Sequence, residues 1–577
     1  MLPINSFFSQ RYDGISVLVI VPHQDDEINA AGALIYTLSR CGAKISLVYS
    51  TNGDWKNPAH IRFQEAVSSA AILGVKEENI YFLGYGDAQA SPEHNHLFYT
   101  VSSPATSTAG FKETYGADSH QDYAYKKTGA HHSYLASNYL EDIVAIIREI
   151  KADLIVCTDF DEHPDHRMLS LYFDRAMGLV RKAEPEYRPE VWKRFAYSLG
   201  YTAVADYSLI NNPETKRPIV GITGKYEREI IGTSVYDWEE RIRIPTPYAN
   251  AEFRENPLIK ALNRHKSQFI ITRADRILNS DEVYWRRRTD SLSYSAVITV
   301  SSGKGDYLND FMLYDVSELD SPAPLYMNYY WQPERNDCLK RIKLHWDTPQ
   351  HIEQIVLYGT ITCDSNIKKI RIELSDGYDV VHGGIQPHGR PTRISVGAHD
   401  NITDCEISLV EVDGTDYGLS EVEVYGSATP DSIIRPFCKI LVNDNFAYEY
   451  LCDMETKSLS LDLYCYGTES SESIRVVKGN SKIIDRQLVI DNSDSDIHLQ
   501  AENAEQGIAD YVVIKRLSQR QQREFIRKDK SVKRYLARAK WRQKMSNMYY
   551  ILKNQGCSAV IFRIFKNHIL PKKYGTK

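Results

Sequence analysis

The chain has 577 residues, of which 42% are hydrophobic and 25% charged, with a formal net charge of −7. This composition is typical of a soluble globular protein, and the length predicts about three or four domains of roughly 150 residues. Nine cysteines without a Cys-x-x-Cys pair argue against a disulfide framework, and no apolar run reaches about 20 residues. Because residues 1–10 also lack the features of a secretory signal, we expect a cytoplasmic protein.

The first predicted elements are a buried strand and the helix that follows it. Ser16–Val21 is a short, β-branched apolar run, and from Glu27 apolar residues recur at helical spacing. His23, Asp25 and Asp26 therefore lie in the strand-to-helix turn, where open α/β sheets bind ligands. An ordinary helix-capping turn is the alternative for this segment alone.

A second group of the same kind follows the predicted strand Asp153–Thr158. Asp161, His163, Asp165 and His166 come directly after it, and a helix to about Lys182 begins at once. Two strand ends that both carry His and Asp can meet across one crevice of a parallel sheet. The pair of groups favours a metal site over two unrelated capping turns.

These two segments resemble the signature blocks of the PIG-L or LmbE-like zinc-dependent N-deacetylases. The blocks are Pro22-His23-Gln24-Asp25-Asp26-Glu27 and His163-Pro164-Asp165-His166, and Gln24 stands where the family usually has Pro. The resemblance covers roughly the first 300 residues. Weaker matches occur in the expected order, at 51–54, Arg62, Glu65 and 265–268.

The resemblance implies a role for each matching residue. His23, Asp26 and His166 would bind the metal, and Asp25 would act as general base. His163 would stabilise the oxyanion, with Asp165 orienting its imidazole; a plain loop histidine is the alternative for His163. Zn²⁺ is the expected cofactor, although two imidazoles and one carboxylate also suit Fe²⁺, Co²⁺ or Mn²⁺.

A long polar segment separates the predicted strand Asn79–Leu83 from the predicted helix Ser133–Ile150. Loops of this length are commonly functional or disordered, so a substrate lid and a solvated insertion both remain open. We expect substrate contacts from five residues of this segment and the neighbouring motifs, namely Arg62, Tyr115, His131, His132 and Asp161. For Asp161 the alternative is a cap of the following turn.

The alternation of strands and helices predicts a Rossmann-like parallel sheet for residues 1–305. A further strand is expected at Phe195–Tyr201, and Arg241–Asp290 reads as mostly helical and basic. Arg286, Arg287 and Arg288 near its end would face either solvent or another domain.

After about residue 306 the pattern changes to short strands separated by turn residues, as in a β-sandwich. Gly418–Gly426 resembles the last strand of discoidin or galactose-binding-like modules, which gives a predicted domain over 306–428 (resemblance at about 310–428). Carbohydrate binding and a packing role both remain open for it. The candidate glycan contacts are Tyr329, Tyr330, Trp331 and Trp346, with core packing as the alternative. A β-rich domain without a readable role follows at 429–517.

The last predicted unit is a basic helical tail at 518–577. From Tyr511 to Lys577 there are 19 Lys or Arg and two acidic residues, a balance of +17 that leaves −24 for the remainder. A helical stripe containing Trp541, Met545 and Tyr549 predicts contact with an anionic membrane surface, peripheral on its inner face. Docking on the acidic body is the alternative; a nucleic-acid partner is disfavoured, because no recognisable module is present.

The leading hypothesis is a metal-dependent carbon–nitrogen hydrolase acting on linear amides. It would remove the N-acetyl group from an N-acetylated amino sugar, such as N-acetylglucosamine, in a glycan precursor or lipid-linked glycoconjugate, as part of glycan biosynthesis. An amidase for another acyl group is the closest alternative. A non-catalytic glycan-binding or assembly protein is an alternative of a different class, against which the intact His23, Asp25, Asp26 and His166 argue.

Overall fold

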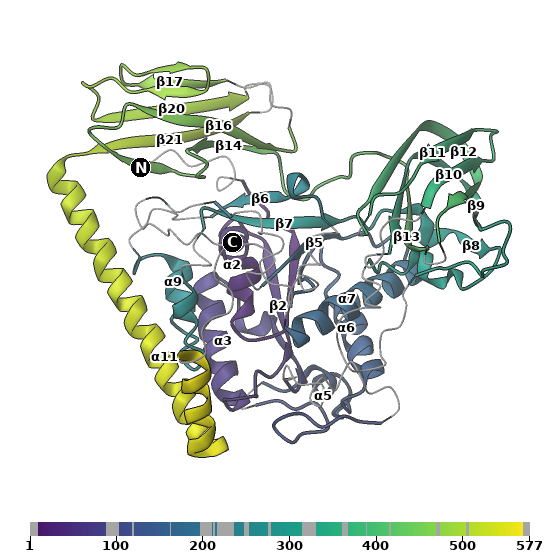
Figure 1. The fold of residues 1–577 in the computed structure, drawn as a ribbon, viewed down its shortest axis with the longest axis horizontal. Helices are drawn as coiled ribbons and strands as arrows, with labels where there is room; N and C mark the ends of the chain where they lie inside the picture. Colours follow the sequence, from purple (N-terminus) through teal and green to yellow (C-terminus); the bar gives the residue numbers. More distant parts are fainter. Residues whose placement is uncertain are drawn as a thin grey trace.

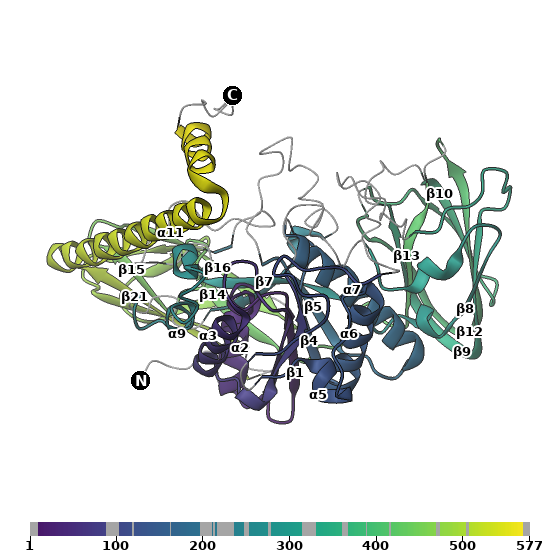
Figure 2. The same cartoon turned by 90° about the horizontal axis from the view of Figure 1, so that it is seen from below.

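The computed structural model contains one α/β unit, two β units and a long C-terminal helix (Figures 1 and 2). It describes residues 10–87, 103–117, 120–161, 163–196, 211, 214–215, 236–246, 253–274, 279–313, 330–360, 367–387, 389–414, 417–468, 473–503 and 507–568, with side chains up to residue 553.

The α/β unit is built on a seven-stranded sheet in which the first five strands are parallel, the sixth runs in the opposite direction and the seventh is antiparallel to the sixth. The spatial order is β3 (Ile80–Tyr85), β2 (Lys44–Thr51), β1 (Ser16–Val21), β4 (Leu154–Thr158), β5 (Glu190–Arg194), β7 (Asp281–Arg287) and β6 (Ile242–Pro245). The chain leaves β1 toward β2 on one side and later returns to β4 on the other. The direction of winding therefore changes between β1 and β4, and the predicted Rossmann-like fold class is confirmed.

Helices cover both faces of this sheet, because alternate residues of its strands are apolar on both sides. Val17 and Val19 point into one core and Leu18 and Ile20 into the other. On the first side lie α2 (Asp26–Arg40), α3 (Ala59–Leu73) and α9 (Pro257–Leu262); on the second lie α6 (Ala136–Ile150) and α7 (Pro164–Ala183). The short elements are α5 (Tyr123–Thr128), η1 (Glu77–Asn79), η4 (Trp238–Glu240), η5 (Ile270–Arg273), η6 (Leu292–Ser295) and η7 (Gly305–Asn309).

Two sequence predictions for this unit are corrected. The strand expected at Phe195–Tyr201 lies earlier, as β5, and residues beyond 196 of that range lie outside the described residues. The stretch expected to be mostly helical contains β6 and β7, whose charged composition hid the strands. In β7, the buried carboxylate of Glu282 accepts the N–H groups of Ala33 and Leu34 (2.9 and 3.0 Å), beside the kink that α2 makes at Ala31. These two hydrogen bonds from α2 compensate for the burial of the Glu282 carboxylate.

The second unit is antiparallel and closes around its own apolar core (Figure 1). Its order is β11 (Asp379–Gly383), β10 (Ile367–Leu374), β12 (Thr392–Val412), β9 (Arg341–Gly359) and β13 (Leu419–Tyr425), with β8 (Val297–Val300) also paired to β9. Trp331 and Trp346 are fully buried in this core, so these two candidate glycan contacts are core residues instead. Tyr329 lies outside the described residues.

The third unit consists of two four-stranded sheets around one core. One sheet is β14 (Phe437–Val442), β16 (Ser458–Tyr466), β19 (Gln487–Val489) and β18 (Lys482–Ile484); the other is β15 (Glu449–Asp453), β21 (Ile508–Leu517), β20 (Asp496–Asn503) and β17 (Ile474–Lys478). A buried ion pair of Lys439 and Asp510 (2.9 Å) joins the two sheets. The prediction of β structure after the first unit is therefore confirmed.

Three consecutive arginines, two at the end of β7 and one directly after it, connect these units. Arg286 donates to the hydroxyl of Tyr466 in the third unit (3.0 Å). Arg288 lies 3.6 Å from the ring of Tyr425 in the second. These arginines therefore face other units of the molecule, which was one of the two predicted alternatives.

The C-terminal helix α11 (Gln519–His568) leaves the third unit and runs alongside the α/β unit, where it contacts η5 and where Tyr535 donates to Asn263 at the end of α9 (Figure 1). The predicted basic helical tail is therefore present. Within the described residues, none of the helices combines the length and the apolar composition that crossing a membrane requires.

Candidate active site

The two predicted motifs come together because β1 and β4 are neighbours in the sheet. Ile20 is paired with Cys157, so both strands end at the same edge of the sheet and at the point where the winding direction changes. His23, Asp25 and Asp26 extend from the end of β1, and His163, Asp165 and His166 from the end of β4. This edge is where doubly wound sheets bind ligands.

The carboxylate of Asp26 is the centre of the cluster. Its Oδ2 lies 2.9 Å from Nδ1 of His23 and 3.2 Å from Nε2 of His166, while Oδ1 accepts from the side chain of Asn29 (3.2 Å). Asp26 and His166 are almost completely buried, and His23 is 7% exposed. The structure thus brings the three predicted metal ligands together.

Two further carboxylates hold the outer nitrogens of the imidazoles. Oδ2 of Asp161 lies 2.8 Å from Nδ1 of His166, and Oδ2 of Asp165 lies 3.0 Å from Nε2 of His23. Carboxylates in this position fix the tautomer and the ring orientation of metal-binding histidines. The carboxylate of Asp165 thus lies nearer to His23 than to His163, whose Nδ1 is 3.8 Å away. Asp161 contacts His166, and its role in substrate binding stays a prediction.

His163 is the most open imidazole of the group. Its side chain is 27% exposed, and its Nδ1 accepts the backbone N–H of Asp165 (3.2 Å). Burial lowers the pKa of His163 well below its ordinary value, and the neighbouring His23 and His166 act in the same direction. A neutral imidazole that accepts at Nδ1 carries its proton on Nε2.

The pKa values of the cluster reflect a balance between burial and opposite charges. Burial favours neutral imidazoles, but the carboxylates outweigh it, which raises the pKa of His166 to about 9 and that of His23 well above its ordinary value. Burial also favours a neutral Asp26, but His166 and His23 hold its pKa well below the ordinary range. Binding of a cation between these donor atoms would therefore release protons from the imidazoles.

The spacing of these donor atoms fits a small divalent cation. A tetrahedral zinc site with bonds of about 2.0 Å separates its ligand atoms by roughly 3.3 Å. The separations of 2.9 and 3.2 Å around Asp26 are close to this value. Ligand atoms of His23, His163 and His166 also lie within 4.8 Å of one another, so His163 faces the same point.

Asp25 lies beside this centre in an unusual backbone conformation. Its φ of 144° falls in the region that L-residues rarely adopt, and such strain is concentrated at functional sites. Burial raises the pKa of the Asp25 carboxyl, although the guanidinium of Arg62, 3.8 Å away, opposes that shift. An aspartate with a raised pKa next to a cation site is suited to move a proton.

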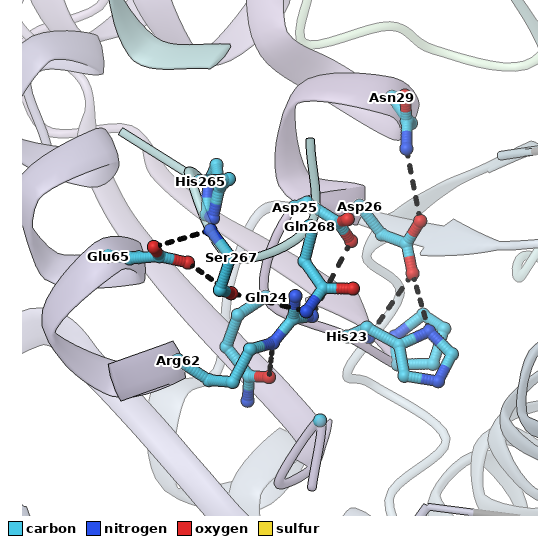
Figure 3. A network of polar contacts seen from close by, with 12 residues as sticks. His23, Gln24, Asp25, Asp26, Asn29, Arg62, Glu65, His265, Ser267 and Gln268 are labelled. Carbon is cyan, nitrogen blue, oxygen red and sulfur yellow. Dashed lines mark hydrogen bonds and ion pairs between the residues drawn. The ribbon is translucent and has the colours of Figure 1, made fainter. Parts of the chain in front are cut away.

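Gln24 has a clear structural role despite its departure from the family pattern. It is fully buried; its amide donates to the carbonyl of Thr51 (2.7 Å), and its Oε1 accepts from Nε of Arg62 (3.4 Å; Figure 3). Gly53 must be glycine here, because a Cβ would lie 2.3 Å from Gln24 Oε1. Gln24 therefore holds Arg62 beside Asp25.

A polar layer behind the turn brings together the weaker sequence matches. The buried carboxylate of Glu27 lies 2.7 Å from Nε2 of His265 and accepts from the hydroxyl of Ser69 (2.8 Å). Glu65 accepts both the backbone N–H and the hydroxyl of Ser267 (2.8 and 2.7 Å; Figure 3). These contacts connect the start of α2 to α3 and to the segment after α9.

Asp87 is a member of the site that the sequence reasoning missed. It follows β3, accepts the N–H of Gly53 (2.8 Å) and lies 4.0 Å from Nε2 of His23. Its backbone N–H donates to Asp54, whose other oxygen accepts from the hydroxyl of Tyr115 (2.6 Å). The rule that selected His23, a polar residue directly after a buried parallel strand, would also have selected Asp87.

Two of the predicted substrate contacts have other partners. His131 lies 2.7 Å from Asp122, which caps α5, and His132 lies 3.1 Å from Asp142 on α6. Both acidic residues are buried. These contacts give both histidines a structural role in the loop, and their role in substrate binding stays a prediction.

Parts of the chain are similar to known proteins. Residues 18–177 match the PIG-L family, described as GlcNAc-PI de-N-acetylase, and residues 295–425 match a family described as "Domain of unknown function (DUF7402)". N,N'-diacetylchitobiose deacetylase from Pyrococcus horikoshii is 22% identical over 32% of this chain and 55% of its own (TM-score 0.20), so the match spans about half of that protein's length.

Two further solved structures are similar to parts of the chain. The zinc-inhibited form of teicoplanin deacetylase Orf2 is 14% identical over 48% of this chain and 99% of its own, with a TM-score of 0.28. The family 32 CBM from C. perfringens NanJ, in complex with galactose, is 13% identical over 23% of this chain and 94% of its own, with a TM-score of 0.18.

Proposed function

Because residues 18–177 form a PIG-L domain, we propose that this chain hydrolyses the acetamido group of an N-acetylated amino sugar. The products are acetate and a free amine. The observation that carries the proposal is the convergence of His23 and His166 on one oxygen of Asp26, directly beside a strained and buried Asp25.

We assign His23, Asp26 and His166 as the ligands of a divalent cation, with Zn²⁺ as the first candidate. When bound, such a cation lowers the pKa of a coordinated water from about 15.7 toward roughly 7 and polarises a carbonyl oxygen. Asp161 and Asp165 hold His166 and His23 in the required tautomers from behind.

Asp25 is the general base of the proposed reaction. It takes a proton from the attacking water, whose oxygen bonds to the amide carbon, and delivers that proton to the nitrogen as the carbon–nitrogen bond breaks. The raised pKa of Asp25 makes it a stronger base than an exposed aspartate, and Arg62 keeps the carboxylate in place.

His163 stabilises the negative charge that develops on the carbonyl oxygen. Because its Nδ1 accepts from the backbone of Asp165, the proton of the neutral ring lies on Nε2, which would donate to the carbonyl oxygen without the ring being positively charged. The lowered pKa of His163 favours this neutral form.

The test is acetate release from a panel of N-acetylhexosamines and their glycosides by full-length protein loaded with Zn²⁺. We expect release from at least one compound, with stoichiometric appearance of the free amine. The absence of acetate release across the panel by protein that binds zinc would contradict the assignment to amino sugars. Release of longer acyl groups instead would identify a different amidase.

A further inference from the structure

The two long faces of α11 have different surroundings. The side chains of Val532, Leu536 and Ala539 pack against the core of the α/β unit, and Leu536 is only 6% exposed. Gln543 lies on the same side of the helix and accepts from the hydroxyl of Thr272 in η5 (3.1 Å). This inner face attaches the helix to the α/β unit.

The opposite face carries large apolar side chains in water. Trp541 is 63% exposed and Tyr549 68% exposed, while Met545 and Leu552 are each 44% exposed. Their spacing of four, four and three residues places them on one side of an α-helix, turned away from Gln543. We call these four residues the outer stripe.

Positive charge continues along the same side of the helix toward its N-terminus. Arg523, Arg527, Arg534 and Arg538 are exposed and fall in line with the outer stripe at 3.6 residues per turn. Over its 50 residues α11 has 14 Lys or Arg and two acidic residues. We call the four arginines the arginine row.

We propose that this outer face of α11 is a docking surface for an anionic lipid bilayer. The outer stripe enters the interface, where Trp and Tyr place an apolar ring beside polar headgroups, and the arginine row contacts anionic headgroups. A second copy of the chain fits less well, because two helices of this charge repel each other. The outer face cannot dock on the rest of this chain, because the inner face already attaches α11 to the α/β unit.

The docking surface lies next to the candidate active site. Thr272, which contacts α11, precedes Arg273, and the charge of Arg273 acts on both Asp25 and His163. Lys56, which follows the site segment containing Gly53 and Asp54, lies 5.6 Å from the ring of Tyr550, immediately after the outer stripe residue Tyr549. A bilayer bound to α11 would therefore lie on the same part of the molecule as the candidate active site.

Flotation of the full-length protein with lipid vesicles tests this proposal without using enzymatic activity. Vesicles of phosphatidylcholine alone are compared with vesicles containing about 30% phosphatidylserine, at about 0.1 M salt. We expect flotation with the anionic vesicles and at least about tenfold less with the neutral ones. A wild-type protein that does not float with the anionic vesicles overturns the proposal.

Three variants identify the residues responsible. Replacing the outer stripe by Gln (Trp541→Gln, Met545→Gln, Tyr549→Gln, Leu552→Gln) preserves helix propensity and should reduce flotation at least about tenfold. Replacing the arginine row by Gln should have an effect of similar size that disappears at about 1 M salt. A control variant with four equally exposed apolar residues of the β units replaced by Thr (Val297, Leu339, Val381 and Val410) should float like wild type.

The variants also distinguish the other occupants of this face. Flotation of the outer stripe variant at the wild-type level would contradict the proposal. So would light scattering that shows a wild-type dimer, a monomeric outer stripe variant and no vesicle binding by either. Binding of single-stranded RNA that depends on the arginine row, without flotation, would assign the surface to nucleic acid instead. Because acetate release from soluble sugars does not enter this test, failure of the proposed function leaves its result unaffected.

Discussion

Two clusters of acidic residues in this molecule have pKa values that are shifted in opposite directions. At the candidate active site, the imidazoles of His23 and His166 hold the pKa of Asp26 well below its ordinary value. At the junction between α7 and the second unit, burial raises the pKa of Asp310 to about 8 and that of Glu421 well above its ordinary value.

The difference comes from the partners of each carboxylate. Asp26 faces two imidazoles at 2.9 and 3.2 Å, whereas Glu421 accepts from the hydroxyl of Tyr294 and the N–H groups of Asp310 and Phe311. The charge of Arg287 lowers the pKa of Glu421 but does not offset the effects of burial, Asp310 and Glu423. The first cluster keeps its charge and can exchange protons for a metal ion, while the second keeps protons and joins two units.

Removing an imidazole should affect the first cluster most strongly. In His166→Ala the carboxylate of Asp26 loses one of its two imidazole partners, and a three-ligand site loses a ligand. We expect bound zinc, measured by plasma mass spectrometry, and acetate release to fall to background. His131→Ala, which removes an imidazole paired with Asp122, should retain zinc. Full zinc content in His166→Ala would refute the ligand assignment.

Removing the proposed base should separate catalysis from metal binding. Asp25→Asn preserves shape but cannot accept the proton, so we expect kcat to fall by about a thousandfold with unchanged zinc content. The measurement is the rate of acetate release at saturating substrate. A variant that keeps the zinc and more than about a tenth of the wild-type rate would exclude Asp25 as the base.

Weakening the support of His166 should have a smaller effect. Asp161→Asn loses the carboxylate that holds Nδ1 of His166, and outer partners of this kind contribute about 10- to 100-fold to metal affinity. Competition with a chromogenic chelator measures that affinity. Asp159→Asn is the matched control, because Asp159 follows the same strand and is equally buried but accepts from Ser170. Equal losses in both variants would indicate a general effect on folding.

The smallest effect is expected at the junction of Asp310 and Glu421, as a change of Tm with pH. An acid whose pKa is raised on folding binds more protons in the folded state, so its contribution to stability falls as pH rises from about 4 to about 8. We expect Tm, measured by scanning calorimetry, to decrease by a few degrees across this range.

The variant Asp310→Asn should decrease less in Tm over the same pH range, because it has no proton to lose. Asp306→Asn, at an exposed aspartate of η7, should behave like wild type. If Asp310→Asn and wild type have the same pH dependence, the carboxyl of Asp310 is ionised in the folded protein and the contrast between the two clusters fails.

Secondary structure and site residues could be predicted from the sequence where a local pattern determines them. The apolar run Ser16–Val21 and the helical period after Glu27 place His23 and Asp26 at a strand end, and the structure has both elements at these positions. Contacts between side chains from distant segments, and elements that depend on such contacts, could not be predicted from the sequence. The link between Asp161 and His166 depends on rotamers, and the strands β6 and β7 depend on the burial of Glu282 and Arg287 by other elements.

The same distinction applies to the aromatic residues. Trp331 and Trp541 are each followed by a polar residue in the sequence, Gln332 and Arg542, yet the first tryptophan is fully buried and the second is 63% exposed. Which of them meets solvent depends on how β8, β9 and β13 close around a core and on which face of α11 contacts the α/β unit. Neither property can be read from a local period.

The central claim is that these donor atoms bind a divalent cation on which amide hydrolysis depends. The most direct test is to titrate chelator-treated protein with Zn²⁺ while measuring acetate release from a responsive N-acetylhexosamine. The account predicts no activity without metal and a linear rise that ends at about one equivalent of zinc. Acetate release that persists after metal removal, or that fails to rise as zinc binds, would contradict it.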